Sequence, residues 1–164
     1  LPVCVAINAF PTDTDEEMDI IYDVCKKAGV PCALSEVFAK GGEGGKALAE
    51  TVLSILDDSA RVHYTYELDA PLTDKIEAVA KKIYRAGGVS YTAAAKKTLD
   101  ELTAQGYGNL PVCIAKTQYS FSDNAKLTGA PEGFTLNVRE VRLSAGAGFV
   151  VVICGSIMTM PGLP

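Results

Sequence analysis

The stretch Val3-Cys-Val-Ala-Ile7 decides the fold class, because this short apolar run is followed by a polar loop and then by an amphipathic helical pattern. A short apolar run bounded by polar residues predicts a buried strand. A second run of this kind, at 30–36, predicts another strand after the helix. Strand, helix and strand in succession form a unit with parallel strands and a right-handed connection. The opening of the chain therefore predicts an α/β fold.

The predicted helix between these two strands has recognisable ends. Thr14 or Asp13 can cap it, and the next three residues are carboxylates, which are favourable in a first helical turn. Gly29 ends the pattern. Apolar positions recur between these ends at helical spacing: Met18, Ile21, Tyr22 and Cys25.

The same signals continue along the chain. Helices are expected over 47–56, after Pro71, and over 92–105. Alternating apolar residues predict a half-buried strand at 134–143, and a continuous apolar run predicts a central strand at 146–154. Residues 62–68 fit either a strand or an extended connection, and 158–164 fit a rigid loop.

One hexapeptide occurs twice, as Leu1-Pro-Val-Cys-Val-Ala6 and Leu110-Pro-Val-Cys-Ile-Ala115. Either an old duplication or similar demands on two buried strands explains it, and the different flanking sequences favour the second explanation. Gly87-Gly88, after a basic helix end, predicts a hinge. We therefore expect two subdomains, 1–85 and 86–164. Both should carry mostly parallel sheet flanked by helices, with extra antiparallel strands in the second.

Composition excludes several classes of function. A net charge of −5 repels phosphate backbones, so we expect no nucleic-acid partner. No apolar run is long enough to span a bilayer, so we expect no membrane partner. Five cysteines without a Cys-x-x-Cys pair predict free thiols in a reducing compartment, the cytoplasm. With His63 as the only histidine and no ligand spacing, we expect no metal site and no nucleophile–histidine arrangement.

Three stretches are candidates for binding. The glycine-rich run at 38–45 fits either an anion-binding loop or a flexible start of a helix. It does not match the P-loop pattern G-x-x-x-x-G-K-[ST], because position 40 is Lys and position 47 is Ala. Phe10 and Phe38 each follow a predicted parallel strand, where each ring either packs under its loop or stacks on a ligand. The loop 116–123 either binds a polar substrate or satisfies its own hydrogen bonds.

Long stretches of the sequence resemble the formate–tetrahydrofolate ligase family, also called formyltetrahydrofolate synthetase. The stretches that carry the resemblance are 5–14, 33–45, 109–123, 138–142, 144–149 and 158–164. They correspond to the C-terminal third of such an enzyme. The resemblance therefore implies that this chain is a fragment that lacks the N-terminal P-loop domain.

The resemblance implies an ATP-dependent reaction in which formate becomes formyl phosphate and N10 of tetrahydrofolate attacks the formyl carbon. It also implies Mg²⁺ and a monovalent cation in the full enzyme, and assembly into a homotetramer. We expect this fragment to bind none of these cofactors, to contain no catalytic residue and to be inactive alone. The alternative is a free-standing, non-catalytic assembly module of the same fold.

The residues that carry over from the family form a wall for the folate ring. Phe10 matches a stacking phenylalanine, and Phe38 stands where many members have tryptophan. The two rings should form an aromatic sandwich, although a phenyl ring offers less stacking area than an indole. The complete set of expected folate-binding residues is Phe10, Phe38, Lys40, Gly41, Gly42 and Glu43.

Overall fold

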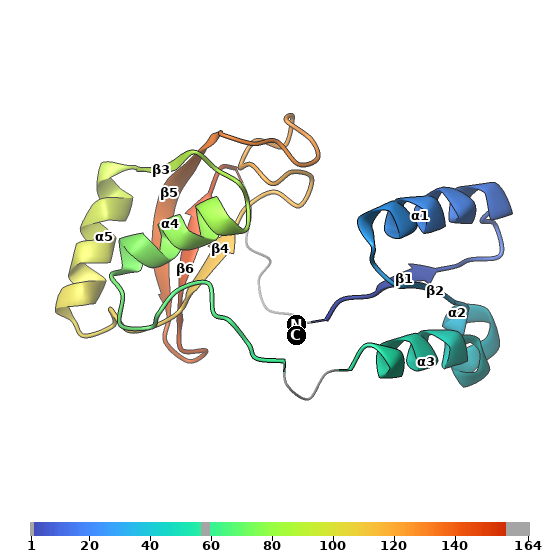
Figure 1. Cartoon of the computed structure of the whole chain (residues 1–164). Coiled ribbons are helices and arrows are strands. Elements are labelled where there is room, and N and C mark those ends of the chain that lie inside the picture. Colours follow the sequence, from blue (N-terminus) through green and yellow to red (C-terminus); the bar gives the residue numbers. More distant parts are fainter. Residues whose placement is uncertain (1, 57–59, 157–164) are drawn as a thin grey trace. The chain divides into compact units, whose positions relative to one another are not determined.

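The computed structural model, shown in Figure 1, describes residues 2–56 and 60–156. The contacts within the chain divide it into two compact units, residues 1–63 and 64–164. The predicted loop at 158–164 and the first residue of the repeated hexapeptide lie outside the described residues.

The first unit begins with the predicted strand–helix–strand arrangement. Its elements are β1 (Val5–Asn8), α1 (Asp15–Ala28) and β2 (Cys32–Ser35). The strands are parallel, with Val5 opposite Cys32 and Asn8 opposite Ser35. The expected topology is therefore confirmed for this part of the chain.

Helix α1 has the ends that its sequence predicts. The Glu17 amide donates to the Thr14 hydroxyl at 3.3 Å, and the Thr14 amide donates to the Glu17 carboxylate at 3.0 Å. This reciprocal pair is a capping box, so Thr14 and not Asp13 is the cap. At the other end Gly29 has φ 67°, a left-handed conformation that glycine adopts without strain.

The segment after β2 is more regular than the sequence indicates. It forms α2 (Val37–Lys40), the 3₁₀ helix η1 (Gly41–Gly45) and α3 (Lys46–Ser54). The prediction of a glycine-rich loop is thus wrong. The Glu36 amide donates to the Gly44 carbonyl at 3.0 Å, and this bond across the run holds it in a helical turn.

The second unit contains the larger sheet. Its elements are α4 (Leu72–Lys82), β3 (Gly88–Tyr91), α5 (Ala93–Ala104), β4 (Val112–Ala115), β5 (Thr135–Ser144) and β6 (Phe149–Cys154). The strand order is β3-β5-β6-β4. Strands β3 and β5 are parallel, as are β4 and β6, whereas β5 and β6 are antiparallel. The expected fold class, α/β with mostly parallel sheet and extra antiparallel pairing in the second part, is confirmed.

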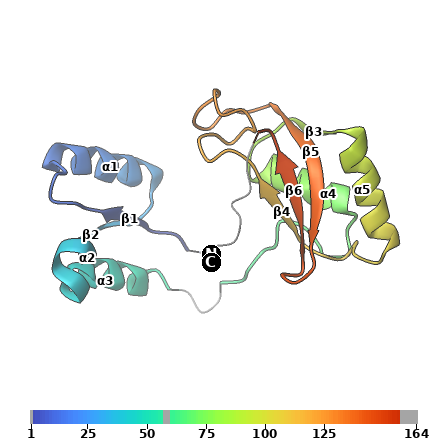
Figure 2. The same ribbon diagram turned by 180° about the vertical axis from the view of Figure 1, so that it is seen from behind.

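The core of the second unit lies between its sheet and its two helices. Helices α4 and α5 pack on the same face of the sheet (Figures 1 and 2). Side chains from α4, α5, β5 and β6 meet there and are almost fully buried. They include Leu72, Ile76, Ala80, Leu99, Leu136, Val138, Val150 and Val152.

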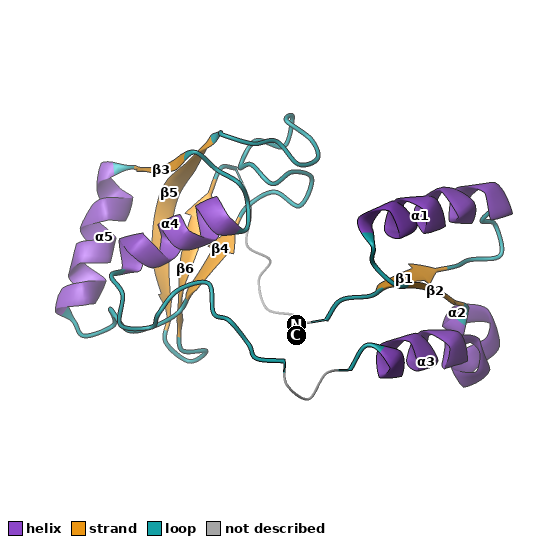
Figure 3. Cartoon of the chain, in the orientation of Figure 1, coloured by secondary structure: helices purple, strands orange, loops and turns teal. Residues whose placement is uncertain are grey.

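The compact units differ from the subdomains expected at 1–85 and 86–164. The predicted hinge at Gly87-Gly88 leads directly into β3, and the Gly87 amide donates to the Phe134 carbonyl at 2.8 Å. Helix α4 also belongs to the second unit, because it packs against that unit's core. Residues 60–71 form a connection without helix or strand, drawn as loop in Figure 3, so the extended alternative for 62–68 is correct. Within the described ranges, no helix is long and apolar enough to cross a membrane.

Candidate functional site

The structure brings Phe10 and Phe38 together. Phe10 lies two residues beyond the end of β1, and Phe38 lies in α2, just beyond the end of β2. Because parallel strands end at the same edge of a sheet, the two rings meet there. Their centroids are 5.2 Å apart and the ring planes are tilted by 50°.

These rings are exposed to an unusual degree. Phe10 is 44 % exposed and Phe38 is 71 % exposed. Buried phenylalanine contributes through the apolar area that it removes from water, and this pair leaves much of that area in contact with solvent. The pair therefore offers an aromatic surface to a planar ligand.

A tight turn holds Phe10 in place. The Ala9 amide donates to the Ser35 carbonyl at 3.0 Å, which continues the strand pairing beyond β1. The Phe10 amide donates to the Asp13 carboxylate at 2.8 Å, and the Asp13 amide donates back to the Phe10 carbonyl at 3.0 Å. Phe10 is thus anchored by two hydrogen bonds of its own backbone to Asp13, and Phe38 lies in a single turn of helix.

The charged residues expected at the rim are paired with their neighbours. Lys40 donates to Glu36 at 2.7 Å, and Lys46 contacts Glu43 at 2.7 Å. All four side chains are substantially exposed, so each ion pair contributes little to the free energy of unfolding. Each charged group can therefore leave its partner to contact a ligand.

Two of the expected glycines leave open space. A Cβ at Gly41 or Gly42 meets nothing within 4 Å, whereas one at Gly44 meets the Glu36 backbone. Gly41 and Gly42 therefore face open space, whereas Gly44 is packed against the backbone of Glu36.

Over 2–56 and 60–156, no three His, Cys, Asp or Glu side chains are grouped so that they can hold a metal ion. The P-loop pattern is absent from all 164 residues. His63 is exposed and lies in the connection between the units.

The polar loop 116–123 satisfies many of its own hydrogen bonds. Ser120 and Ser122 are buried, and their hydroxyl oxygens are 2.9 Å apart. The Tyr119 amide donates to the Thr117 hydroxyl at 3.2 Å. The Lys116 ammonium donates to the carbonyl of Ser120. This arrangement favours the structural alternative for the loop.

The surroundings of Lys116 determine the direction in which its pKa is shifted. Its ammonium lies 4.5 Å from the centre of the Tyr84 ring, a cation–π contact. Burial lowers the pKa of Lys116, and the acidic groups of Cys154 and Asp123 oppose this effect.

Cys154 is fully buried in the sheet, and burial raises its pKa to about 12. Cys154 is consequently an inert core thiol.

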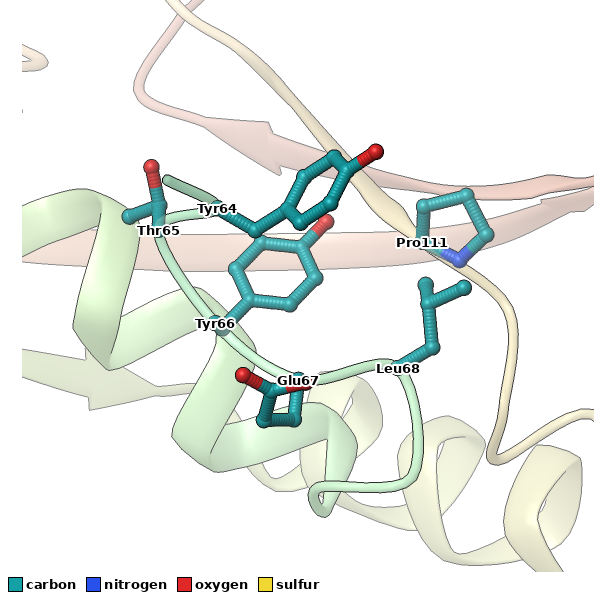
Figure 4. A pocket seen from close by; sticks show the side chains of 6 residues that line it. All are labelled: Tyr64, Thr65, Tyr66, Glu67, Leu68 and Pro111. Atoms are coloured by element: carbon teal, nitrogen blue, oxygen red, sulfur yellow. The ribbon is translucent and has the colours of Figure 1, made fainter. Parts of the chain in front are cut away.

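Residues of the second unit form a cavity of about 520 Å³ (Figure 4). It is lined by Tyr64, Thr65, Tyr66, Glu67, Leu68 and Pro111. The Tyr66 hydroxyl accepts a 3.0 Å hydrogen bond from the Val112 amide, at the start of edge strand β4. This cavity contains none of the residues that sequence reasoning selected. Its only signal in the sequence is a pair of tyrosines two residues apart.

Comparison of the sequence with models of protein families gives a match over residues 1–164. The matching family is described as formate–tetrahydrofolate ligase. The match covers both compact units, including the ring pair of the first.

Proposed function

Because the chain belongs to the formate–tetrahydrofolate ligase family, we propose that it supplies the folate-binding side of a ligase that joins formate to tetrahydrofolate. The observation that carries this proposal is the exposed Phe10–Phe38 pair at the ends of two parallel strands. The pterin ring of tetrahydrofolate is flat and heteroaromatic, and such rings stack on phenyl faces. The proposed contact residues are Phe10, Phe38, Lys40, Gly41, Gly42 and Glu43.

Insertion of a ring between the two phenylalanines requires one of them to move. An inserted ring needs roughly 3.5 Å on each side, hence about 7 Å between the phenyl rings. Their present separation is 5.2 Å, with the planes tilted. Phe38 is the more exposed ring, and the Phe10 backbone is held by Asp13, so Phe38 moves and Phe10 remains as the fixed wall.

In the reaction that we propose, N10 of the bound tetrahydrofolate faces an activated formyl group. Formate is first phosphorylated by ATP, which gives formyl phosphate and ADP. The N10 amine then attacks the formyl carbon and phosphate leaves, giving 10-formyltetrahydrofolate. In this scheme the ring pair orients the pterin and excludes water from one side, which raises the effective concentration of the amine.

We further propose that the nucleotide, Mg²⁺ and a monovalent cation bind to a P-loop domain that these 164 residues do not contain. Family membership and the lack of a P-loop pattern support this division. By the same analogy the working enzyme is a cytoplasmic homotetramer. The catalytic groups then lie outside this chain.

Alanine substitutions test the ring pair. Phe10→Ala and Phe38→Ala should each weaken tetrahydrofolate binding about tenfold, because each removes one stacking face. Isothermal titration of the 164-residue chain under anaerobic conditions measures the dissociation constant. Tyr64→Ala is the matched control, since Tyr64 is an exposed aromatic residue of the other cavity. Loss of binding in Tyr64→Ala with normal binding in both phenylalanine variants would move the folate site to that cavity.

A turnover assay tests the proposal that the nucleotide binds outside these 164 residues. The chain, mixed with ATP, formate, Mg²⁺ and tetrahydrofolate, should release neither ADP nor 10-formyltetrahydrofolate above the rate of the enzyme-free mixture. The physical reason is that the sequence has no P-loop to hold the transferred phosphoryl group. Sustained production of both products would show that a nucleotide site exists within these residues.

The alternative function is a non-catalytic assembly module. Exposed apolar side chains on helices α1 and α3 favour it, among them Ile20, Val24 and Leu53. The titration separates the two ideas, because a pure assembly module has no measurable affinity for tetrahydrofolate.

A further inference from the structure

Two cysteines of the first unit meet where α1 is joined to β2. Cys25 lies in the last turn of α1, and Cys32 is the first residue of β2. The Val30 amide donates to the Cys25 carbonyl at 3.0 Å, so the chain reverses tightly between the two cysteines. Cys25 is buried, and Cys32 is partly exposed.

The two cysteines line the same cavity. That cavity has a volume of about 330 Å³ and is lined by Tyr22, Asp23, Cys25, Lys26, Val30 and Cys32. Burial is the main cause of a raised pKa at Cys32, and a hydrogen bond with the Cys25 thiol adds to it, as does the nearby thiol of Cys4. Cys32 is therefore protonated at neutral pH.

We propose that Cys25 and Cys32 are a redox modification site, at which oxidised glutathione or a similar small disulfide converts the two thiols into an intrachain disulfide. Their shared cavity and the tight turn between them carry this proposal. A disulfide requires its two sulfurs to come within bonding reach, and the turn keeps the two residues close together at one end of α1.

The reaction proceeds by two exchanges. The Cys32 thiolate, on the more accessible residue, attacks one sulfur of the small disulfide, and one glutathione thiolate leaves. The Cys25 thiolate then attacks the Cys32 sulfur, which forms the Cys25–Cys32 bond and releases the second glutathione. The protein loses two protons and two electrons, and the small disulfide is reduced to two thiols.

The second unit provides an internal control. Cys113 is exposed on β4, whereas Cys154 is buried on β6. Cys113 lies opposite Val151 and so projects from the face opposite to that of Cys154, because neighbouring side chains of a strand alternate. Cys113 therefore has no route to a disulfide with Cys154 and should retain glutathione as a mixed disulfide.

Mass spectrometry of the whole 164-residue chain after incubation with oxidised glutathione tests the proposal. We expect a Cys25–Cys32 cross-link two hydrogens lighter than the dithiol, and glutathione on Cys113. Trypsin cleaves between these cysteines at Lys26 and Lys27, so the linked peptides are diagnostic. A second digestion at Glu16 and Glu17 separates Cys4 from Cys25 on the first tryptic peptide.

Two variants complete the test. Cys4→Ser should preserve the cross-link, and Cys25→Ala should leave Cys32 holding glutathione. The proposal is overturned if Cys25 and Cys32 stay reduced while Cys113 is fully modified. It is also overturned if wild-type Cys32 links to Cys4, or if each of the pair carries its own glutathione. The wild-type digestion decides these outcomes even if a variant fails to fold.

Discussion

Replacement of Gly44 by alanine is expected to destabilise the first unit by about 3 kcal/mol and to weaken folate binding. The added Cβ would lie 2.5 Å from the carbonyl oxygen of Glu36 and 2.6 Å from its carbonyl carbon. Both neighbours are backbone atoms, so a rotamer change cannot relieve the overlap. The hydrogen bond from the Glu36 amide to the Gly44 carbonyl has to lengthen or break.

The substitution should also displace the ring pair, because Glu36 immediately precedes α2, which contains Phe38. Hydrogen exchange at the Glu36 amide reports the local opening directly. Urea unfolding reports the loss of stability, and titration with tetrahydrofolate reports the effect on the site.

Gly42→Ala is the matched control for this substitution. It adds the same methyl group two residues away, in the same 3₁₀ helix, where nothing lies within 4 Å. It should leave exchange and unfolding close to those of the wild type. Equal behaviour of the two variants would show that the close approach of Gly44 to Glu36 does not stabilise the segment.

Lys75→Met should destabilise the second unit by about 3 kcal/mol. Lys75 is fully buried, and its ammonium donates to the carbonyls of Gly108 at 2.7 Å and Leu110 at 3.0 Å. Methionine keeps the apolar stem but leaves two partly buried carbonyl acceptors without this donor. Burial lowers the pKa of Lys75, because the charged ammonium is unfavourable where water is excluded. Removal of the charge therefore offsets part of the lost stability.

Thermal and urea unfolding of the second unit measure this effect, with Lys81→Met as the control. Lys81 lies on the same helix, is half exposed and pairs with Glu77 at 2.6 Å. Such a surface pair contributes at most about 1 kcal/mol, so the control should change little. A Lys75→Met variant as stable as the wild type would show that relief of the buried charge offsets both hydrogen bonds.

The sign of the pH dependence follows from the lowered pKa of Lys75. The pKa of Lys75 is lower in the folded chain than in the unfolded chain, where it has its ordinary value of 10.5. At a pH between these two values, the unfolded chain binds more protons at Lys75 than the folded chain does. Stability gained from this group therefore rises with pH between the folded pKa and 10.5. The wild type should show this rise relative to Lys75→Met, and the difference isolates Lys75 from other groups that titrate in alkali.

Much of the first unit could be predicted from its sequence. The strand–helix–strand order, the Thr14 cap and the Gly29 end of α1 are all determined by residues within a turn or two of each other. The helix expected over 47–56 ends at Ser54, and its apolar residues Ala47 and Val52 are exposed in the structure. Periodicity identifies an apolar stripe but not whether another element covers it.

The sequence also predicted only part of the candidate site. Strand ends placed Phe10 and Phe38 near one edge, and the structure brings the rings into contact. The prediction of an aromatic sandwich with room for a ligand remains a proposal, because the 5.2 Å separation requires Phe38 to move. Ring orientation depends on the α2 turn, which was expected to be an irregular loop.

The sequence by itself determined the α/β class, the ends of the main helices and the family, because these depend on local spacing and on contiguous motifs. Only the tertiary structure revealed the strand at the predicted hinge, the burial of Lys75 against residues 108 and 110, and the cavity shared by Cys25 and Cys32. Each of these depends on partners that the folded chain brings together. Pairing of β3 with a strand some 45 residues away turned a double glycine, which locally favours a hinge, into the start of a sheet.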